Sequence, residues 1–261
     1  MICKGNEVFS DYDVATKNET QLEQILLNAH IPEYHYQVVN SYPHEARSFT
    51  EGLIWEPGGL VYESTGLYGQ SKLRKIEIKS GKILQEYGLP SHYFAEGITI
   101  LGNQLYQLTY QEHTGFIYDK NSFHLKKQFT YVSEGWGLTT DNHQLIMSNG
   151  SSFLTFMDVK TLKTVRTLPV NINNYPVKSL NALQYINGMI YANVWPTSII
   201  VIISAQTGKV EGWMNIKALK PASGCTECVA NGIAYNDQDN LLLVTGKNWP
   251  YFYEIRVFRE K

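Results

Sequence analysis

Charged residues are scarce in this chain of 261 residues, because Asp, Glu, Lys and Arg together make up only 18% of it. The formal net charge is −2, so lysine and arginine form no basic excess that could neutralise phosphates, and we expect no nucleic-acid partner. Hydrophobic residues amount to 43%, which is enough to build a sizeable core and excludes a largely disordered chain. The length suits one large domain or two small ones.

Cysteine is also scarce, since only Cys3, Cys225 and Cys228 are present. They are too few for a disulfide framework, but Cys225 and Cys228 are spaced for a local disulfide, half of a zinc site or two free thiols. A zinc site needs two further ligands, and neither a second cysteine pair nor a nearby histidine pair follows. We therefore expect no metal, whereas the disulfide and the free thiols remain open. Cys3 is unpaired in either case.

Long hydrophobic runs are missing as well. The longest purely aliphatic run, residues 199–203, is far too short to cross a bilayer, so we expect no membrane span. The first residues also lack the charged-then-apolar pattern of a signal peptide.

What the chain does contain is a short unit that occurs five times. In each copy a small residue is followed by an aliphatic one and preceded by a polar or aromatic one. The copies are Glu51-Gly52-Leu53, Glu96-Gly97-Ile98, Trp136-Gly137-Leu138, Asn181-Ala182-Leu183 and Asn231-Gly232-Ile233. Their small residues are 45, 40, 45 and 50 positions apart. A period of about 40 to 50 residues is typical of a four-stranded propeller blade.

The strands around these units predict how the ring closes. Three further short strands, separated by turn residues, follow most units. The fifth unit lacks a fourth strand, because only three residues remain after residue 258. A lone strand near residues 34–41 can fill that place. We therefore predict an all-β, five-bladed β-propeller over residues 34–261, with four antiparallel strands per blade and the last blade closed by an N-terminal strand.

Residues 1–33 precede this domain. Leu22, Ile25 and Leu26 have helical spacing, and Pro32 disfavours helical geometry in the residue before it. We expect a tail or short helix.

The first strand of a propeller blade lines the central channel, so the residues before the five markers should converge: Glu51, Glu96, Trp136, Asn181 and Asn231. The ends of the second strands should add Glu63, Tyr110, Asn149, Trp195 and Lys247. Small residues are needed at a crowded axis whatever the function, and a tryptophan there could simply fill the channel. A buried carboxylate is costlier, because it must be neutralised or hydrogen-bonded. Glu51 and Glu96 are therefore the more informative residues, although Lys247 could pair with one of them in a purely structural role.

Several strings resemble the plant and bacterial type of glutaminyl cyclotransferase. They are Phe94-Ala95-Glu96-Gly97-Ile98, Tyr62-Glu63-Ser64-Thr65-Gly66-Leu67-Tyr68-Gly69, Glu134-Gly135-Trp136-Gly137-Leu138, Ala192-Asn193-Val194-Trp195 and Thr245-Gly246-Lys247-Asn248-Trp249-Pro250. The resemblance runs from about residue 42 to residue 258 and implies a five-bladed propeller. It also implies an enzyme that converts the N-terminal glutamine of peptides or proteins to pyroglutamate and releases ammonia, without zinc or another cofactor. Relatives of this kind are commonly exported, so we expect a periplasmic or secreted protein, and a monomer.

The resemblance also implies roles for single residues. The catalytic glutamate falls on Glu96, and the pocket residues fall on Glu51, Tyr110, Trp136, Asn181, Trp195 and Lys247. The chemistry suits these groups, since one carboxylate can take a proton from the attacking amine and return it to the leaving nitrogen. Lys247 and Asn181 could stabilise the negative charge on the amide oxygen. The substrate-binding residues would be Glu51, Tyr110, Trp136 and Trp195, with the aromatic side chains as walls that hold the substrate.

The sequence departs from the usual family pattern at four positions. Glu51 stands where glutamine is more common, Tyr110 where tryptophan is usual, and Ala182 and Gln184 where glutamates are typical. Two nearby carboxylates tend to raise the pKa of one of them, so Glu51 could tune the reaction or indicate a changed substrate.

Two alternatives remain open at this point. The same pocket could bind a peptide terminus or an amine without catalysis. A glycosidase is the other alternative, with Glu51 and Glu96 as its two carboxyl groups about 5–5.5 Å or about 6.5–9.5 Å apart.

Overall fold

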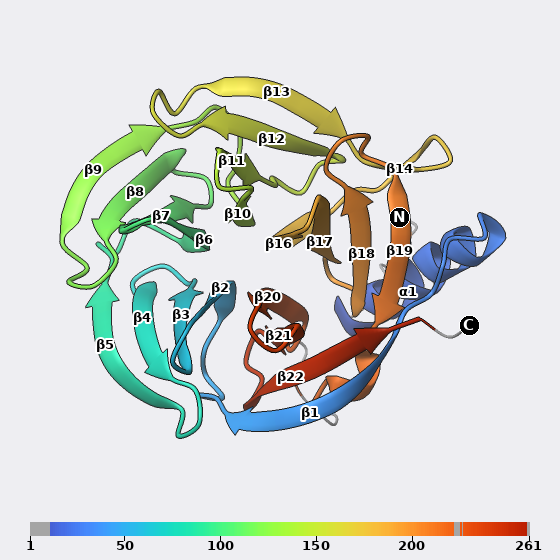
Figure 1. Cartoon of the computed structure of the whole chain (residues 1–261), viewed down its shortest axis with the longest axis horizontal. Helices are drawn as coiled ribbons and strands as arrows, with labels where there is room; N and C mark the ends of the chain where they lie inside the picture. The colour runs from blue at the N-terminus through green and yellow to red at the C-terminus, as the bar shows by residue number, and fades with distance from the viewer. Residues whose placement is uncertain (1–10, 222–224, 226, 260–261) are drawn as a thin grey trace, which may run out of the picture.

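Five four-stranded sheets surround a central axis in the computed structural model of the chain (Figure 1). The structure describes residues 11–221, 225 and 227–259. In every sheet the neighbouring strands are antiparallel. The all-β, five-bladed propeller predicted from the repeat is confirmed.

Four blades consist of consecutive strands, numbered from the axis outward. The first blade is β2 (Thr50–Glu56), β3 (Leu60–Thr65), β4 (Lys72–Glu77) and β5 (Lys82–Gly88). The second is β6 (Ala95–Leu101), β7 (Gln104–Thr109), β8 (Thr114–Asp119) and β9 (Leu125–Thr130). The third is β10 (Leu138–Thr140), β11 (Gln144–Met147), β12 (Phe153–Asp158) and β13 (Thr164–Pro169). The fourth is β16 (Leu180–Ile186), β17 (Met189–Val194), β18 (Ile199–Ser204) and β19 (Val210–Asn215).

The fifth blade joins the two ends of the propeller. It contains β20 (Ala230–Asn236), β21 (Leu241–Gly246) and β22 (Tyr251–Phe258), and its outer strand is β1 (His35–Pro43). β1 runs antiparallel to β22, from the pair His35 and Phe258 to the pair Pro43 and Tyr251. The predicted closure by an N-terminal strand is therefore confirmed, and the edge of β22 is covered.

Outside the five sheets the chain forms a short hairpin of β14 (Asn171–Ile172) and β15 (Tyr175–Pro176), a 3-10 turn η1 (Lys217–Leu219) and the helix α1 (Asp11–Asn28). The helix lies beside the fourth blade (Figure 1), and its Leu22 and Leu26 are buried there. No helix within the described ranges is long and apolar enough to cross a membrane.

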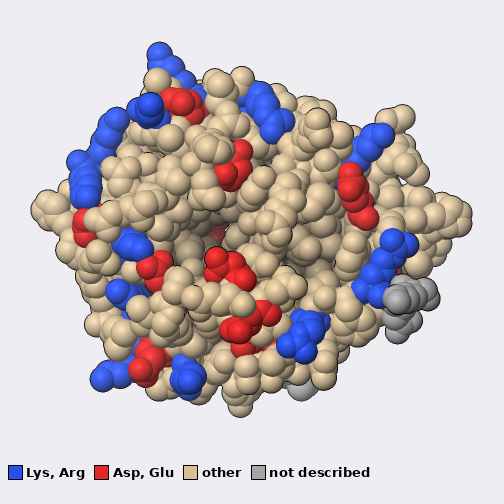
Figure 2. Space-filling model, viewed as in Figure 1, with Lys and Arg blue, Asp and Glu red and all other residues tan. Residues whose placement is uncertain are grey.

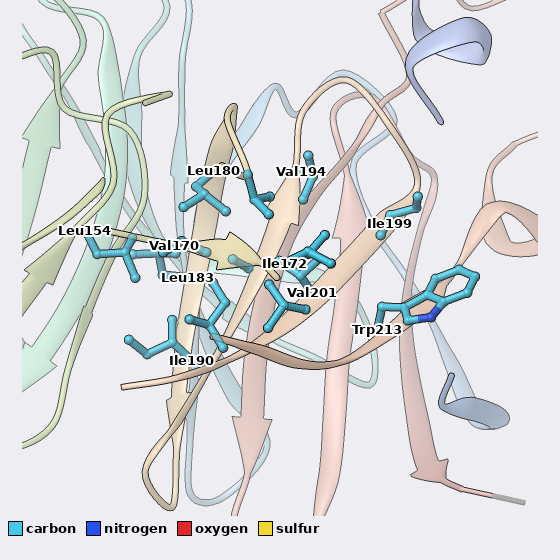
Figure 3. Close-up of a cluster of buried hydrophobic side chains, with 14 of the residues drawn as sticks. Leu154, Val170, Ile172, Leu180, Leu183, Ile190, Val194, Ile199, Val201 and Trp213 are labelled. Atoms are coloured by element: carbon cyan, nitrogen blue, oxygen red, sulfur yellow. The ribbon is translucent and has the colours of Figure 1, made fainter. Parts of the chain in front are cut away.

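The largest apolar cluster fills the space between the third and fourth blades. In Figure 3 the side chains of Leu154 from β12, Leu183 from β16 and Val201 from β18 lie together, and all of them are buried. Burying a leucine or valine side chain contributes about 1.5–3 kcal/mol relative to leaving it exposed. Such clusters fix each blade against the next and so fix the positions of the inner strands.

The small residues of the repeat allow the inner strands to approach one another closely. A Cβ atom on Gly97 would lie 2.4 Å from the backbone nitrogen of Leu138, and one on Gly137 would lie 2.0 Å from the carbonyl oxygen of Asn181. Neighbouring inner strands therefore touch through their backbones, and no larger side chain fits at these two positions.

The same positions interrupt the strand pairing. The register shifts between Thr50 and Gly52 in β2 and between Ala95 and Ile98 in β6. β16 and β20 shift at the equivalent places. Such bulges re-aim single side chains, and they are common next to active sites. In these four strands the bulge includes the residue that precedes the small residue, so this residue lies outside the regular strand pairing.

Figure 2 shows one face of the ring, with acidic and basic side chains interspersed around its rim and a hollow near its centre. At the ends of the inner strands, Trp55, Thr140 and Tyr185 contribute to a cavity of about 300 Å³. The candidate site lies at the opposite ends of these strands.

Candidate active site

A cavity of about 430 Å³ lies where the inner strands begin. All seven site residues predicted from the sequence line it, namely Glu51, Tyr110, Glu96, Trp136, Asn181, Trp195 and Lys247. The remaining lining residues are Asn18, Phe49, Phe94, Ser179, Pro196, Glu227 and Val229.

Two positions on each blade supply the predicted residues. Glu51, Glu96 and Asn181 lie at the bulges of β2, β6 and β16, and Trp136 directly precedes Gly137 at the start of the third blade. Tyr110, Trp195 and Lys247 each come one residue after a second strand, at the ends of β7, β17 and β21. The two layers thus meet at the same mouth of the channel, as the repeat predicts.

Glu51 is held by two donors. Its Oε1 atom lies 2.5 Å from the Lys247 ammonium nitrogen, and its Oε2 atom accepts a 2.8 Å hydrogen bond from the Asn231 amide. Asn231 also donates to the carbonyl oxygen of Thr50 at 2.9 Å. The Lys247 ammonium lies 4.3 Å from the centre of the Phe49 ring, a cation–π contact. Burial raises the pKa of Glu51, while Lys247 and Asn231 act against that rise by stabilising the carboxylate.

Glu96 has no such support. Its side chain is 95% buried, since its exposed fraction is 5%, and its Oε2 atom has no hydrogen-bond partner among the described residues. Burial, followed by the charge of Glu51, raises the pKa of Glu96 well above its usual value. The two carboxyl groups lie on neighbouring inner strands and line the same cavity. Of this pair, Glu96 is therefore the group that keeps a proton to the higher pH.

Asn181, which also lines the cavity, carries a second buried atom without a partner in the described ranges. Its side chain is 4% exposed, and its Oδ1 atom has no partner within the part of the chain that is described. A buried polar atom without a partner is costly, so a bound ligand with an N–H group would relieve this cost.

Aromatic side chains form the remaining walls. Trp136 and Trp195 meet edge to face, with ring centres 6.0 Å apart, and the ring of Phe94 lies 5.8 Å from that of Tyr110. Trp195 is 41% exposed and so stands at the rim. The walls would shield a small ligand from water while the rim keeps an entrance open.

Residues 11–257 match the model of the family described as Glutamine cyclotransferase. The chain belongs to this family. The resemblance stated from the sequence motifs is confirmed.

Two cyclotransferase relatives illustrate how far the similarity extends. A protein of Arabidopsis thaliana named Glutaminyl-peptide cyclotransferase is 38% identical over 226 residues, which cover 85% of this chain and 71% of the relative. The solved structure described as the crystal structure of Myxococcus xanthus Glutaminyl Cyclase superposes with a TM-score of 0.81 at 32% identity. The superposition covers 88% of this chain and 100% of the Myxococcus xanthus chain.

Two aromatic residues of the cavity were not predicted from the sequence. Phe49 and Phe94 line the cavity, and each lies two residues before a site glutamate. Because side chains at i and i+2 share one face of an extended chain, the repeated pattern Phe-x-Glu-Gly carried a signal for them.

Asn18 was also missed. It lies in α1, far from the propeller repeats in the sequence, and no motif marks it.

Glu63 was expected near the pocket, and this expectation is wrong. Glu63 lies inside β3 rather than after it, is fully buried, and accepts hydrogen bonds from Thr50 at 2.8 Å and His44 at 2.8 Å. The equivalent of Tyr110 in the first blade is Gly66, where a Cβ atom would lie 2.3 Å from the Phe94 ring. Asn149, which binds the Ser151 hydroxyl, is also absent from the lining of the cavity.

The structure also decides between the alternatives for the cysteine pair. Cys225 and Cys228 form a disulfide with an S–S distance of 2.08 Å. Glu227, between them, reaches the cavity. Cys3 lies outside the described residues. No group of three or more His, Cys, Asp or Glu side chains placed to hold a metal occurs in the described ranges.

Proposed function

We propose that the protein is a glutaminyl-peptide cyclotransferase, which closes the N-terminal glutamine of a peptide or protein to pyroglutamate and releases ammonia. The observation that carries this proposal is the unpartnered carboxyl oxygen of Glu96, buried in a cavity beside the pair of Glu51 and Lys247. A buried carboxyl group with a raised pKa suits a task in which one group takes and then returns a proton.

The reaction forms one bond and breaks another. The α-amine nitrogen of the substrate attacks the side-chain amide carbon, and the bond between that carbon and the amide nitrogen breaks. Glu96 takes the proton lost by the attacking amine and delivers a proton to the departing nitrogen, which leaves as ammonia. Because the reacting groups belong to one residue, holding them close supplies a large share of the rate enhancement.

Lys247 and Asn181 are proposed to stabilise the tetrahedral intermediate, in which the amide oxygen becomes negative. The Lys247 ammonium is already fixed by Glu51, so little reorganisation is needed when this charge develops. Oδ1 of Asn181 is free to accept a hydrogen bond from a nitrogen of the substrate, while its amide N–H groups would serve the oxygen.

Glu51, Tyr110, Trp136 and Trp195 are proposed to bind the substrate. The aromatic rings would hold the aliphatic part of the glutamine side chain and exclude bulk water, and the carboxylate of Glu51 would attract the cationic amine. The exposure of Trp195 at the rim supports contact with the residues that follow glutamine.

We further propose that the reaction needs no metal. The support is the donor set, since the ammonium of Lys247 already occupies the place beside Glu51 where a cation would be bound. Activity should survive dialysis against a chelator, and reactivation by added zinc would contradict the proposal.

The proposed activity is tested by mass spectrometry of glutamine-initiated peptides after incubation with the protein, together with an assay for free ammonia. Product with the mass of the cyclised peptide and equimolar ammonia would support it. Binding of the peptide without either product would instead indicate a non-catalytic binding propeller. The alternative of a glycosidase is disfavoured, because residues 11–257 match the glutamine cyclotransferase family.

We also propose an exported protein, periplasmic or secreted. The disulfide of Cys225 and Cys228 supports an oxidising compartment. The monomeric state stays a prediction, which light scattering on a sizing column would test.

A further inference from the structure

Three glutamates surround the mouth of the candidate site, each on a different loop. Glu112 lies between β7 and β8, Glu134 precedes the third blade, and Glu227 lies within the disulfide loop before β20. None of the three forms an ion pair with any residue that the structure describes.

Glu112 and Glu134 are fixed by neutral donors at the edge of the cavity. The Tyr68 hydroxyl donates to Glu112 at 2.7 Å. The indole N–H of Trp136 donates to Glu134 at 3.1 Å, and the Gln111 amide donates to it at 3.0 Å. Glu112 is close enough to contribute to the raised pKa of Glu96. Both carboxyl groups therefore lie close to residues that line the cavity, Glu134 beside Trp136 and Glu112 near Glu96.

Glu227 lines the cavity directly. The disulfide on either side of it closes the loop, and the carbonyl oxygen of Val229 accepts a 2.9 Å hydrogen bond from the backbone N–H of Lys247. The loop is thus attached to the second strand of the fifth blade, which holds the third glutamate at the rim.

Two residues that line the cavity carry a buried polar atom that a bound ligand could satisfy. Oε2 of Glu96 and Oδ1 of Asn181 lack partners among the described residues, and both side chains are more than nine-tenths buried. The lining contains the carboxyl groups of Glu51, Glu96 and Glu227 against one cation, Lys247, which already pairs with Glu51.

Four basic residues lie on the loops of this face, namely Arg47, Lys178, Lys217 and Lys220. Lys217 pairs with Glu19 of α1 at 3.2 Å, and Lys178 lines an adjoining cavity next to α1.

We propose that Glu112, Glu134 and Glu227 select peptides in which a basic residue follows the N-terminal glutamine. This inference rests on the proposed function and specifies its substrate class. Once the glutamine occupies the cavity, the next residues must pass the rim, where arginine or lysine would meet uncompensated carboxylates and an acidic residue would be repelled. Attraction at an exposed rim is screened by salt, so the selection should weaken as ionic strength rises.

The test compares three peptides that differ at one position, Gln-Arg-Ala, Gln-Ala-Ala and Gln-Glu-Ala. The wild-type protein should favour the arginine peptide over the glutamate peptide by about tenfold in kcat/KM at low salt, as expected for a few exposed charge pairs. The triple variant Glu112→Gln, Glu134→Gln, Glu227→Gln should reduce that ratio to about twofold or less. The ratio compares two peptides on the same variant, so a loss of activity that affects both peptides equally cancels out.

Glu211→Gln is the matched control, because Glu211 is an exposed carboxylate on the outer strand β19. It removes one negative charge without touching the mouth, so the wild-type ratio should persist. Turnover of all three peptides at similar rates, or an unchanged ratio in the triple variant, would overturn this proposal alone. Absence of turnover with every peptide would overturn the proposed function, and this proposal with it.

Discussion

Lys247 holds its ammonium nitrogen 2.5 Å from Oε1 of Glu51, and this contact separates the two carboxyl groups of the cavity into different chemical roles. Glu51 has a cation and an amide donor, which offset part of the rise that burial causes in its pKa. Glu96 on the neighbouring strand β6 has an oxygen without a partner among the described residues, and its pKa is raised well above its usual value. Two carboxyl groups whose environments push their pKa values apart are the usual arrangement for an acid and base assignment.

Replacing Glu51 by glutamine should move the acidic limb of the pH–rate profile. The charge of Glu51 helps to raise the pKa of Glu96. Without it, and with Lys247 no longer paired, that pKa should fall. The limb of kcat/KM that reports deprotonation of Glu96 should then shift to lower pH. Glu134→Gln is the control, since it removes a charge at the rim and should shift the limb far less. An unmoved limb in Glu51→Gln would show that Glu96 is not the titrating base.

Replacing Glu96 by glutamine should abolish most of the activity but not the fold. Loss of a general acid and base costs about 10²- to 10⁴-fold in rate, which a kinetic assay with Gln-Ala-Ala would measure. The pKa of Glu96 is raised in the folded state, so the folded protein loses stability as pH rises from the unfolded value near 4.3 towards the folded one. Because glutamine does not titrate, the Glu96→Gln variant does not lose stability in this way as pH rises.

The midpoint of thermal unfolding of Glu96→Gln at pH 7 should therefore equal or exceed that of the wild type. Wild-type activity in this variant would refute the proposed acid–base role.

The architecture was predictable because its signal is repeated in the sequence. Close approach of neighbouring inner strands demands a small residue in every blade, as Gly97 and Gly137 show, so the period is visible without knowledge of the contacts. The strand near residue 34 could be placed in the last blade for a similar reason, since the fifth unit lacked one strand.

The exact set of residues that line the cavity could not be predicted, because it depends on strand ends, bulges and helix docking that no single residue reveals. Whether a side chain faces the cavity depends on where its strand ends, and Glu63 was misplaced because it lies three residues short of Gly66, the true rim position. The bulges that aim Glu51 and Glu96 are properties of strand pairing rather than of composition. The contribution of Asn18 arises from docking of α1 on the fourth blade, which the repeat does not encode.

Glu63 should govern stability at acidic pH. It pairs with His44 at 2.8 Å and lies 3.6 Å from Arg74, both mostly buried. These partners hold the pKa of Glu63 below its usual value. The stability it contributes is therefore present above the unfolded pKa near 4.3 and lost as pH falls below it. Glu63→Gln should lower the free energy of unfolding at pH 7 by about 3 kcal/mol, because buried partners lose their counter-charge.

Urea unfolding at pH 7 and at pH 4 measures this effect, and the difference between wild type and Glu63→Gln should shrink at the lower pH. Glu86→Gln is the matched control, since Glu86 also pairs with Arg74 but is 35% exposed, so it should cost about 1 kcal/mol or less. Equal losses from the two substitutions would contradict a special role for the buried pair.

The helix α1 should support the substrate pocket through Glu19. Oε2 of Glu19 accepts a 2.9 Å hydrogen bond from the backbone N–H of Ser198, two residues beyond Pro196, and Pro196 and Trp195 line the cavity. Glu19→Ala leaves that buried N–H unpaired, at a cost of about 1–3 kcal/mol, and frees the segment that carries the two wall residues. We expect KM for Gln-Ala-Ala to rise about three- to tenfold while kcat changes little, because Glu96 and Lys247 lie on other blades. Gln24→Ala, at an exposed position on the same helix whose side chain donates to Asn28, should leave KM unchanged. If Glu19→Ala lowers kcat and leaves KM intact, the helix influences the reacting groups rather than the wall.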